Sequence, residues 1–265
     1  MTLSQAQLRE FDEKGYLFFP ELFSPQELRV LLDEIGVLAA RETDGNLKEK
    51  SGAARQLYNS HRDSRAFKAL SGHPRILTGV RQIVGNEVYI WHSKINVKEA
   101  FEGTVWLWHQ DYGYWFHDGV DPKLVSCMVY LDEATHENGC LMVVPGSHRL
   151  GRVEHVPDEI TTSYKQWTIP LDIMRTATRE TGIVSLTDKP GSAVVFHCNL
   201  IHGSNHNMSP RSRKSVIFAY NDIANKPRPV PNPRADYVVS RRFDIVQLEA
   251  EDALQKLAAQ GAEVA

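Results

Sequence analysis

The sequence has few cysteines, no long apolar run and no block of like charge, and each absence excludes a class of protein. Its three cysteines, Cys127, Cys140 and Cys198, are too few and too scattered for a disulfide framework or a cysteine zinc site. No segment approaches the roughly 20 apolar residues of a membrane span, and no basic and apolar leader opens the chain. We therefore expect a cytoplasmic protein with reduced thiols and no membrane contact.

Charge and repetition exclude further classes. The 30 Lys and Arg and 33 Asp and Glu are interspersed, so no basic patch points to a nucleic-acid partner. No internal repeat or low-complexity tract is present. With 265 residues, 42% of them hydrophobic, the chain can bury one large core. We expect a single domain over 1–265 that is a monomer or a homodimer.

Residues 1–85 carry helix signals. Ser24 and Glu27 form a capping box at the start of an apolar stripe with helical spacing. Residues 41–55 are polar and are expected to be loop, and 63–84 is expected to hold one or two helices. The stripe comprises Leu28, Leu31, Leu32, Ile35 and Leu38.

From residue 87 onward, short runs of β-branched and aromatic residues alternate with turn residues, which predicts a sandwich or jelly roll. We place this core at 87–221, with a more polar insertion at 149–190 that is a candidate lid. A C-terminal extension, 222–265, is Pro-rich at first and then has a helix at about 246–259. The expected strands lie at 88–91, 104–109, 125–131, 139–145, 192–197 and 213–220.

The most informative pattern is His109-Gln110-Asp111 with His202 far downstream. Two histidines and a carboxylate hold Fe(II) on one face and leave the opposite positions open. Residues i and i+2 of a strand share a face, so His109 and Asp111 can point into one cavity. A lone His-x-Asp is weak evidence, because His61-Arg62-Asp63 matches equally and looks like a polar helix start.

Arg213 strengthens the pattern, because it follows His202 by eleven residues on a predicted strand. A planar guanidinium binds a carboxylate through two parallel hydrogen bonds. Arg213 is therefore a natural anchor for the far carboxylate of 2-oxoglutarate, and Ser204 can add a hydroxyl donor.

Taken together, these residues resemble the phytanoyl-CoA dioxygenase family of iron(II)- and 2-oxoglutarate-dependent oxygenases. The resemblance is nearest to its bacterial branch of ectoine hydroxylases and free amino-acid (leucine-type) hydroxylases, and it runs from Phe11 to about Tyr237. The matching pieces are Val88–Ile90 with Ile95-Asn96, Trp108–Asp111, Asn138-Gly139, Pro145–Arg149, His202–Ser204 and Arg213.

The resemblance implies a mainly β fold, a cupin-like jelly roll or double-stranded β-helix with N-terminal helices packed outside. It implies an oxidoreductase that uses Fe(II), 2-oxoglutarate and O₂ to hydroxylate a small molecule. By the resemblance, His109, Asp111 and His202 bind iron, Arg213, Ser204 and Asn96 bind 2-oxoglutarate, and His92, Lys94 and Trp115 bind substrate. Halogenating relatives lack the metal carboxylate, so Asp111 favours hydroxylation.

The chain also departs from this branch. After the iron-binding Asp, ectoine hydroxylases read Phe-Glu-Thr-Trp, whereas this chain reads Tyr112-Gly113-Tyr114-Trp115, and Lys94 replaces an arginine. These differences argue against ectoine as the substrate. Lys94 and His92 still suit a small carboxylate-bearing substrate, such as a free amino acid or its derivative.

Other interpretations stay open at this stage. His109 and Asp111 can be a buried hydrogen-bonded pair, with His197 or His206 as a rival ligand if the strand register differs. His92, Lys94 and Asn96 can be the solvent face of an edge strand. The chain can also be a hydroxylase that tailors a larger natural product, a barrel that binds without turnover, or a zinc hydrolase.

Overall fold

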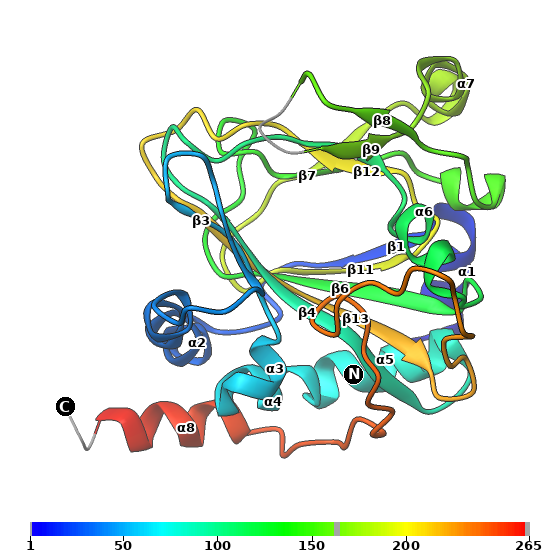
Figure 1. Ribbon diagram of the computed structural model, residues 1–265. Coiled ribbons are helices and arrows are strands. Elements are labelled where there is room, and N and C mark those ends of the chain that lie inside the picture. Colours follow the sequence, from blue (N-terminus) through cyan, green and yellow to red (C-terminus); the bar gives the residue numbers. More distant parts are fainter. Residues whose placement is uncertain (1, 162–164, 263–265) are drawn as a thin grey trace.

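The computed structural model describes residues 2–161 and 165–262, and its two larger antiparallel sheets face each other (Figure 1). This is the jelly roll, or double-stranded β-helix, that the sequence predicts. The larger sheet has the order β1 (Tyr16–Phe19), β11 (Ala193–His197), β6 (Leu124–Tyr130), β13 (Arg213–Asp222), β4 (Val88–Lys98), β3 (Ala54–Tyr58), β2 (Asn46–Lys48). The smaller sheet has the order β10 (Val184–Leu186), β7 (Leu141–Val143), β12 (His202–Ser204), β5 (Trp106–His109).

Helices cover the outer face of the larger sheet, as predicted (Figure 1). The capping box forms, because the Ser24 hydroxyl accepts from the Glu27 N–H and the Glu27 carboxylate accepts from the Ser24 N–H at 2.8 Å. Among the helices that the structure describes, none has the length and apolar composition that crossing a bilayer requires. The helices on this side are α2 (Pro25–Ala39), α3 (Ser60–Asp63), α4 (Arg65–Ser71), α5 (Pro74–Val84) and α8 (Ala253–Ala262); α1 (Gln5–Lys14) lies beside β1.

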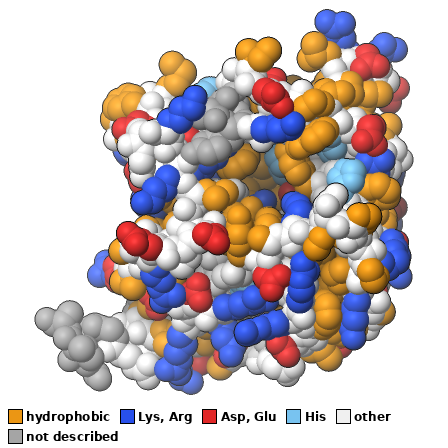
Figure 2. Space-filling model, viewed as in Figure 1, with side chains coloured by type: hydrophobic (Ala, Val, Ile, Leu, Met, Phe, Trp, Pro, Cys, Tyr) orange, Lys and Arg blue, Asp and Glu red, His pale blue; other side chains and the backbone are white. Residues whose placement is uncertain are grey.

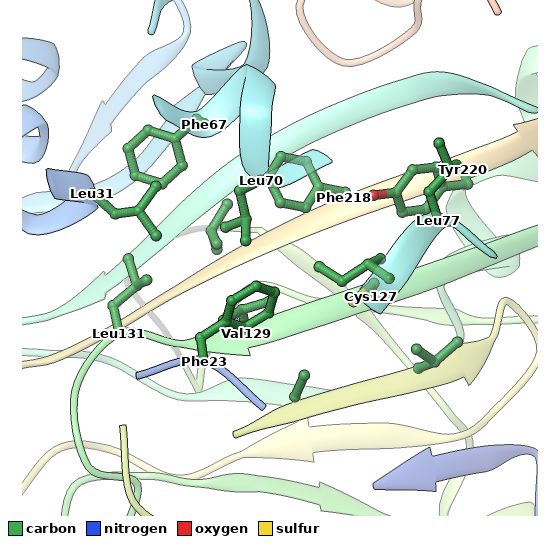
Figure 3. Close-up of a cluster of buried hydrophobic side chains, with 14 of the residues drawn as sticks. Phe23, Leu31, Phe67, Leu70, Leu77, Cys127, Val129, Leu131, Phe218 and Tyr220 are labelled. Carbon is green, nitrogen blue, oxygen red and sulfur yellow. The ribbon is translucent and has the colours of Figure 1, made fainter. Parts of the chain in front are cut away.

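The main core lies between these helices and the larger sheet (Figure 3). Leu31 of α2 and Phe67 and Leu70 of α4 are fully buried there, opposite Val129 of β6 and Phe218 of β13. Side chains alternate across a strand. The neighbours of these core residues on β6, β13 and β4 therefore point to the other side, into the space between the two sheets.

Three expectations about irregular segments need correction. Residues 41–55 contain β2 and the start of β3 rather than loop alone. The last helix starts at Ala253 rather than near 246, because the chain before it is extended: the Val246 N–H donates to Val88 O and the Glu249 N–H donates to Gly72 O. The stretch 149–190 ends in β10, which pairs with β7 and so belongs to the barrel.

The rest of that stretch is ordered around two elements. A hairpin joins β8 (Val156–Asp158) to β9 (Gln166–Thr168), and α7 (Leu171–Thr181) follows. Residues 162–164 lie outside the described residues. The role of this segment as a lid stays a prediction.

The second His-x-Asp motif belongs to the helical cover and gives a test of pH-dependent stability. His61 lies in α3, with Nδ1 2.7 Å from Ser93 Oγ, and burial followed by the Arg62 charge lowers its pKa to about 3. An unfolded histidine has a pKa of about 6.5. Between these pKa values the unfolded chain binds one more proton than the folded chain. The contribution of His61 to the unfolding free energy is therefore fully present above about pH 6.5 and is lost as the pH decreases.

We expect His61→Asn to reduce the pH dependence of the unfolding free energy by up to about 1.4 kcal/mol per pH unit between pH 6 and 4. Urea unfolding of the metal-free protein across this range measures it. His136→Asn, at an exposed histidine, is the control and should leave the slope unchanged. An unchanged slope in His61→Asn would contradict the prediction.

Candidate metal centre

Strand pairing brings the three predicted ligands together. His109 ends β5 and His202 begins β12, and the two residues are direct partners in the antiparallel register. Gln110 keeps an extended backbone (φ −107°, ψ 136°), and α6 (Asp111–Trp115) starts at the next residue. Asp111 is therefore the first residue of a helix rather than part of a strand, but the extended Gln110 preserves the alternation that turns it to the same side as His109.

The three side chains form a compact metal-ligand set. Their ligand atoms lie within 4.8 Å of one another, and no other such group occurs in the part of the chain that the structure describes. His109 Nδ1 lies 2.6 Å from Leu107 O and His202 Nδ1 lies 2.9 Å from Leu200 O. Since each Nδ1–H donates to a carbonyl, each Nε2 keeps its lone pair for a metal.

The protonation states also suit a metal. Burial lowers the pKa of both His109 and His202, which keeps the imidazoles neutral. Burial by itself would raise the pKa of Asp111, but the nearby Lys94 charge and the two histidines outweigh it and lower this pKa to about 2. Ser126 adds a hydrogen bond of 2.8 Å to Asp111 Oδ2. The donor set, two neutral imidazoles and one carboxylate, fits Fe(II).

A cavity of about 290 Å³ lies beside these ligands, between the two sheets. A hollow is visible between the layers on the face shown in Figure 2. Its wall includes every residue predicted for the site: the three metal ligands with Arg213, Ser204, Asn96, His92, Lys94 and Trp115. The structure brings all nine together, while the individual roles of the non-ligands stay predictions.

Two alternatives left open by the sequence are wrong: an edge strand at His92–Asn96, and His197 or His206 as a metal ligand. β4, which carries His92, Lys94 and Asn96, is an inner strand between β13 and β3, and these side chains face the cavity rather than solvent. His197 packs its ring against His148 at 5.4 Å and is not part of the metal-ligand group, and neither is His206.

Arg213 is buried on the cavity wall, and one of its three guanidinium nitrogens has no partner among the described residues. Its Nη1 donates to Ser215 Oγ at 3.0 Å and its Nη2 to Gly139 O at 2.6 Å. The Asn138-Gly139 turn is thus also a contact of the site. Within the described residues, Arg213 Nε has no hydrogen-bond partner. Because a buried charged donor without a partner is costly, this site fits the carboxylate of a ligand such as 2-oxoglutarate.

Several wall residues have no signal in the sequence. Tyr58 of β3 and Arg234 and Val238 of the C-terminal extension line the cavity. Val238 O lies 2.9 Å from His92 Nδ1, and Arg234 forms an ion pair with the buried Asp118. Tyr114 packs against the His109 ring, with centroids 5.7 Å apart. Only the tertiary fold brings these residues to the site.

Two histidines and a carboxylate at one wall of a jelly-roll cavity, with a buried arginine at another, define the iron(II)- and 2-oxoglutarate-dependent dioxygenases. Comparison with known proteins specifies this class further. The chain belongs to the phytanoyl-CoA dioxygenase (PhyH) family, whose sequence model matches residues 11–215.

Characterised relatives match over most of their length. The chain is 33% identical over 257 residues to the ectoine dioxygenase of Bordetella bronchiseptica, covering 91% of this chain and 83% of that protein. It is 32% identical over 253 residues to the L-proline trans-4-hydroxylase of Streptomyces griseoviridis, covering 90% and 93%. The crystal structure of EctD from S. alaskensis with 2-oxoglutarate and 5-hydroxyectoine superposes with a TM-score of 0.82 at 31% identity, covering 93% of this chain and 87% of that one.

Proposed function

We propose that the protein hydroxylates an unactivated C–H bond of a small carboxylate-bearing substrate, a free amino acid or an amino-acid derivative. The observation that carries this proposal is one cavity whose wall joins the metal-ligand triad, Lys94 and Arg213, whose Nε has no partner among the described residues. Its volume of about 290 Å³ is at the lower end for small-molecule sites and argues against a large natural product.

The chain's own residues divide into two groups. His109, Asp111 and His202 would hold Fe(II), while Arg213, Ser204 and Asn96 would bind 2-oxoglutarate. When bound with O₂, iron and 2-oxoglutarate supply the oxidising chemistry, and the protein supplies orientation and a site shielded from water. Neither a barrel that only binds nor a zinc hydrolase needs a buried guanidinium in the cavity wall with a nitrogen that has no partner among the described residues.

Two further side chains of β4, Lys94 and His92, suit the two charged groups of an amino acid. Lys94 is mostly buried, and its ammonium lies 3.9 Å from Asp111 Oδ1, so it can donate hydrogen bonds to a substrate carboxylate near the metal. His92 donates its Nδ1–H to Val238 O, which leaves Nε2 as an acceptor with no partner among the described residues. Burial followed by the Lys94 charge lowers the pKa of His92 to about 3, so the ring is neutral and suits a substrate N–H.

The direct test is a screen for succinate release with Fe(II), 2-oxoglutarate and O₂. The panel contains free amino acids, L-proline and ectoine, each with its amide or a decarboxylated analogue. We expect turnover of at least one amino acid or derivative and little turnover without its carboxylate. Turnover of acyl-CoA thioesters and of no amino acid would overturn the proposal.

Lys94→Met tests the substrate anchor. Losing a hydrogen bond to a charged group costs about 1.5–3 kcal/mol, so we expect the KM for the best carboxylate substrate to rise about 10- to 150-fold. Lys165→Met is the matched control, because Lys165 also lines the cavity but is half exposed. Equal effects of the two substitutions would contradict the assignment of Lys94.

We also place the enzyme in the cytoplasm as part of this proposal. Its three cysteines are buried free thiols. A reducing compartment suits both these thiols and a ferrous cofactor.

A further inference from the structure

His155 is not among the residues that line the cavity beside the metal ligands. It is buried, and its Nε2 accepts a hydrogen bond of 3.0 Å from the backbone N–H of Gln110. Gln110 is the residue between His109 and Asp111. His155 therefore contacts the peptide between two metal ligands.

The side chain of Gln110 also holds this segment in place. Gln110 Nε2 donates to Gly151 O and to Asn199 O, both at 2.8 Å, and Gln110 Oε1 accepts from the Val153 N–H at 2.8 Å. Gln110 is fully buried. The turn that carries His109 and Asp111 is thus tied to residues 151–155 and to the segment that leads to His202.

Gly113 shows how closely His155 fits against this turn. A Cβ atom built on Gly113 would lie 1.5 Å from His155 Cε1, which no packing can accommodate without moving the ring. In the motif that follows the iron-binding Asp, ectoine hydroxylases have glutamate where this chain has Gly113. The close contact between Gly113 and His155 is therefore one of the features in which this chain differs from them. The missing side chain makes room for the imidazole.

The His155 ring is in the protonation state that lets Nε2 accept a hydrogen bond. Burial, followed by the Arg152 charge, lowers the pKa of His155 to about 4, so the ring is neutral. Since Nε2 accepts from Gln110, the proton resides on Nδ1, which has no hydrogen-bond partner within the described residues. Among the residues that the structure describes, the Gln110 N–H is the hydrogen-bond partner found for this ring.

We propose that His155 is a positioning residue for the metal centre: by accepting the Gln110 N–H, it fixes the peptide so that His109 and Asp111 converge on one metal ion. This inference rests on the proposed function only in taking the site to bind iron. In other metal sites, residues that hold the ligands in place from outside typically raise the metal affinity about 10- to 100-fold.

The test measures binding of Co(II), a visible spectroscopic probe for Fe(II), to the intact chain by calorimetric titration and by its ligand-field absorption. We expect His155→Leu to weaken Co(II) binding about 10- to 100-fold and to change the spectrum. His155→Gln should restore both, because an amide oxygen can accept the same N–H. His73→Leu is the matched control: His73 is also buried and also accepts a backbone N–H, from Arg75, but it lies in the helical cover.

Three results would overturn the inference: unchanged binding in His155→Leu, an equal loss in His155→Gln, or an equal loss in His73→Leu. If His155→Leu does not fold, Gly113→Ala decides, because the added methyl group displaces the ring and is expected to weaken Co(II) binding; normal binding there would also overturn it. Metal binding is measured without substrate. A wild-type protein that binds Co(II) but hydroxylates nothing in the panel would therefore contradict the proposed function and leave this inference standing.

Discussion

Asp111→Ala is expected to abolish hydroxylation, with activity reduced about 1000-fold or more, because the site loses its only anionic ligand while two neutral imidazoles remain. The substitution also leaves the Ser126 hydroxyl and the Lys94 ammonium without the carboxylate they face. The measurements are succinate release and the weak visible absorption of the anaerobic protein with Fe(II) and 2-oxoglutarate.

The chain provides a matched control for this experiment. Asp63 ends the other His-x-Asp motif and is exposed in α3, so Asp63→Ala should keep both the activity and the absorption. If Asp111→Ala keeps the wild-type absorption and turnover, the three residues are not the iron site.

Arg213→Leu is expected to raise the KM for 2-oxoglutarate about 30- to 4000-fold, which corresponds to the roughly 2–5 kcal/mol lost when one partner of a buried charged hydrogen bond is removed. Iron affinity should stay the same, because Arg213 is not one of the three residues of the metal-ligand group. Arg213→Lys keeps the charge but loses the planar pair of donors, so an intermediate KM is expected.

Titration of 2-oxoglutarate against the anaerobic iron protein gives the affinity directly, and steady-state assays give the KM. The control is Arg211→Leu, at an exposed arginine two residues earlier that pairs with Glu133 on the surface. Similar 2-oxoglutarate constants for Arg213→Leu and Arg211→Leu would contradict an anchoring role for Arg213.

The sequence predicted those parts of the fold whose pattern is local. The long strands β4, β6 and β13 have runs of β-branched and aromatic residues, and the capping box at Ser24 is a four-residue signal. The pair His109 and Asp111 was also predictable from a local pattern, because only one extended residue, Gln110, separates them and turns both to the same side. Three-residue strands such as β2 and β12 are too short to show a period, so pairing alone defines them.

The missed residues depend on long-range contacts. Arg234 and Val238 follow a Pro-rich segment with no periodicity, and only the folded chain brings them against β4 and the cavity. The contact between Gly113 and His155 joins an ordinary-looking glycine to a histidine in a polar stretch. Neither residue has a neighbouring pattern that would identify the other.

Part of the cavity wall comes from the C-terminal extension, and this has a consequence for how the cavity can change in evolution. The family's sequence model ends at residue 215, just after Arg213, whereas Arg234, Tyr237 and Val238 lie beyond it. The metal-ligand residues and part of the cavity wall are therefore encoded by separate stretches of the gene. Mutation or recombination confined to the later stretch can reshape the cavity while every residue of the metal-ligand group stays in place.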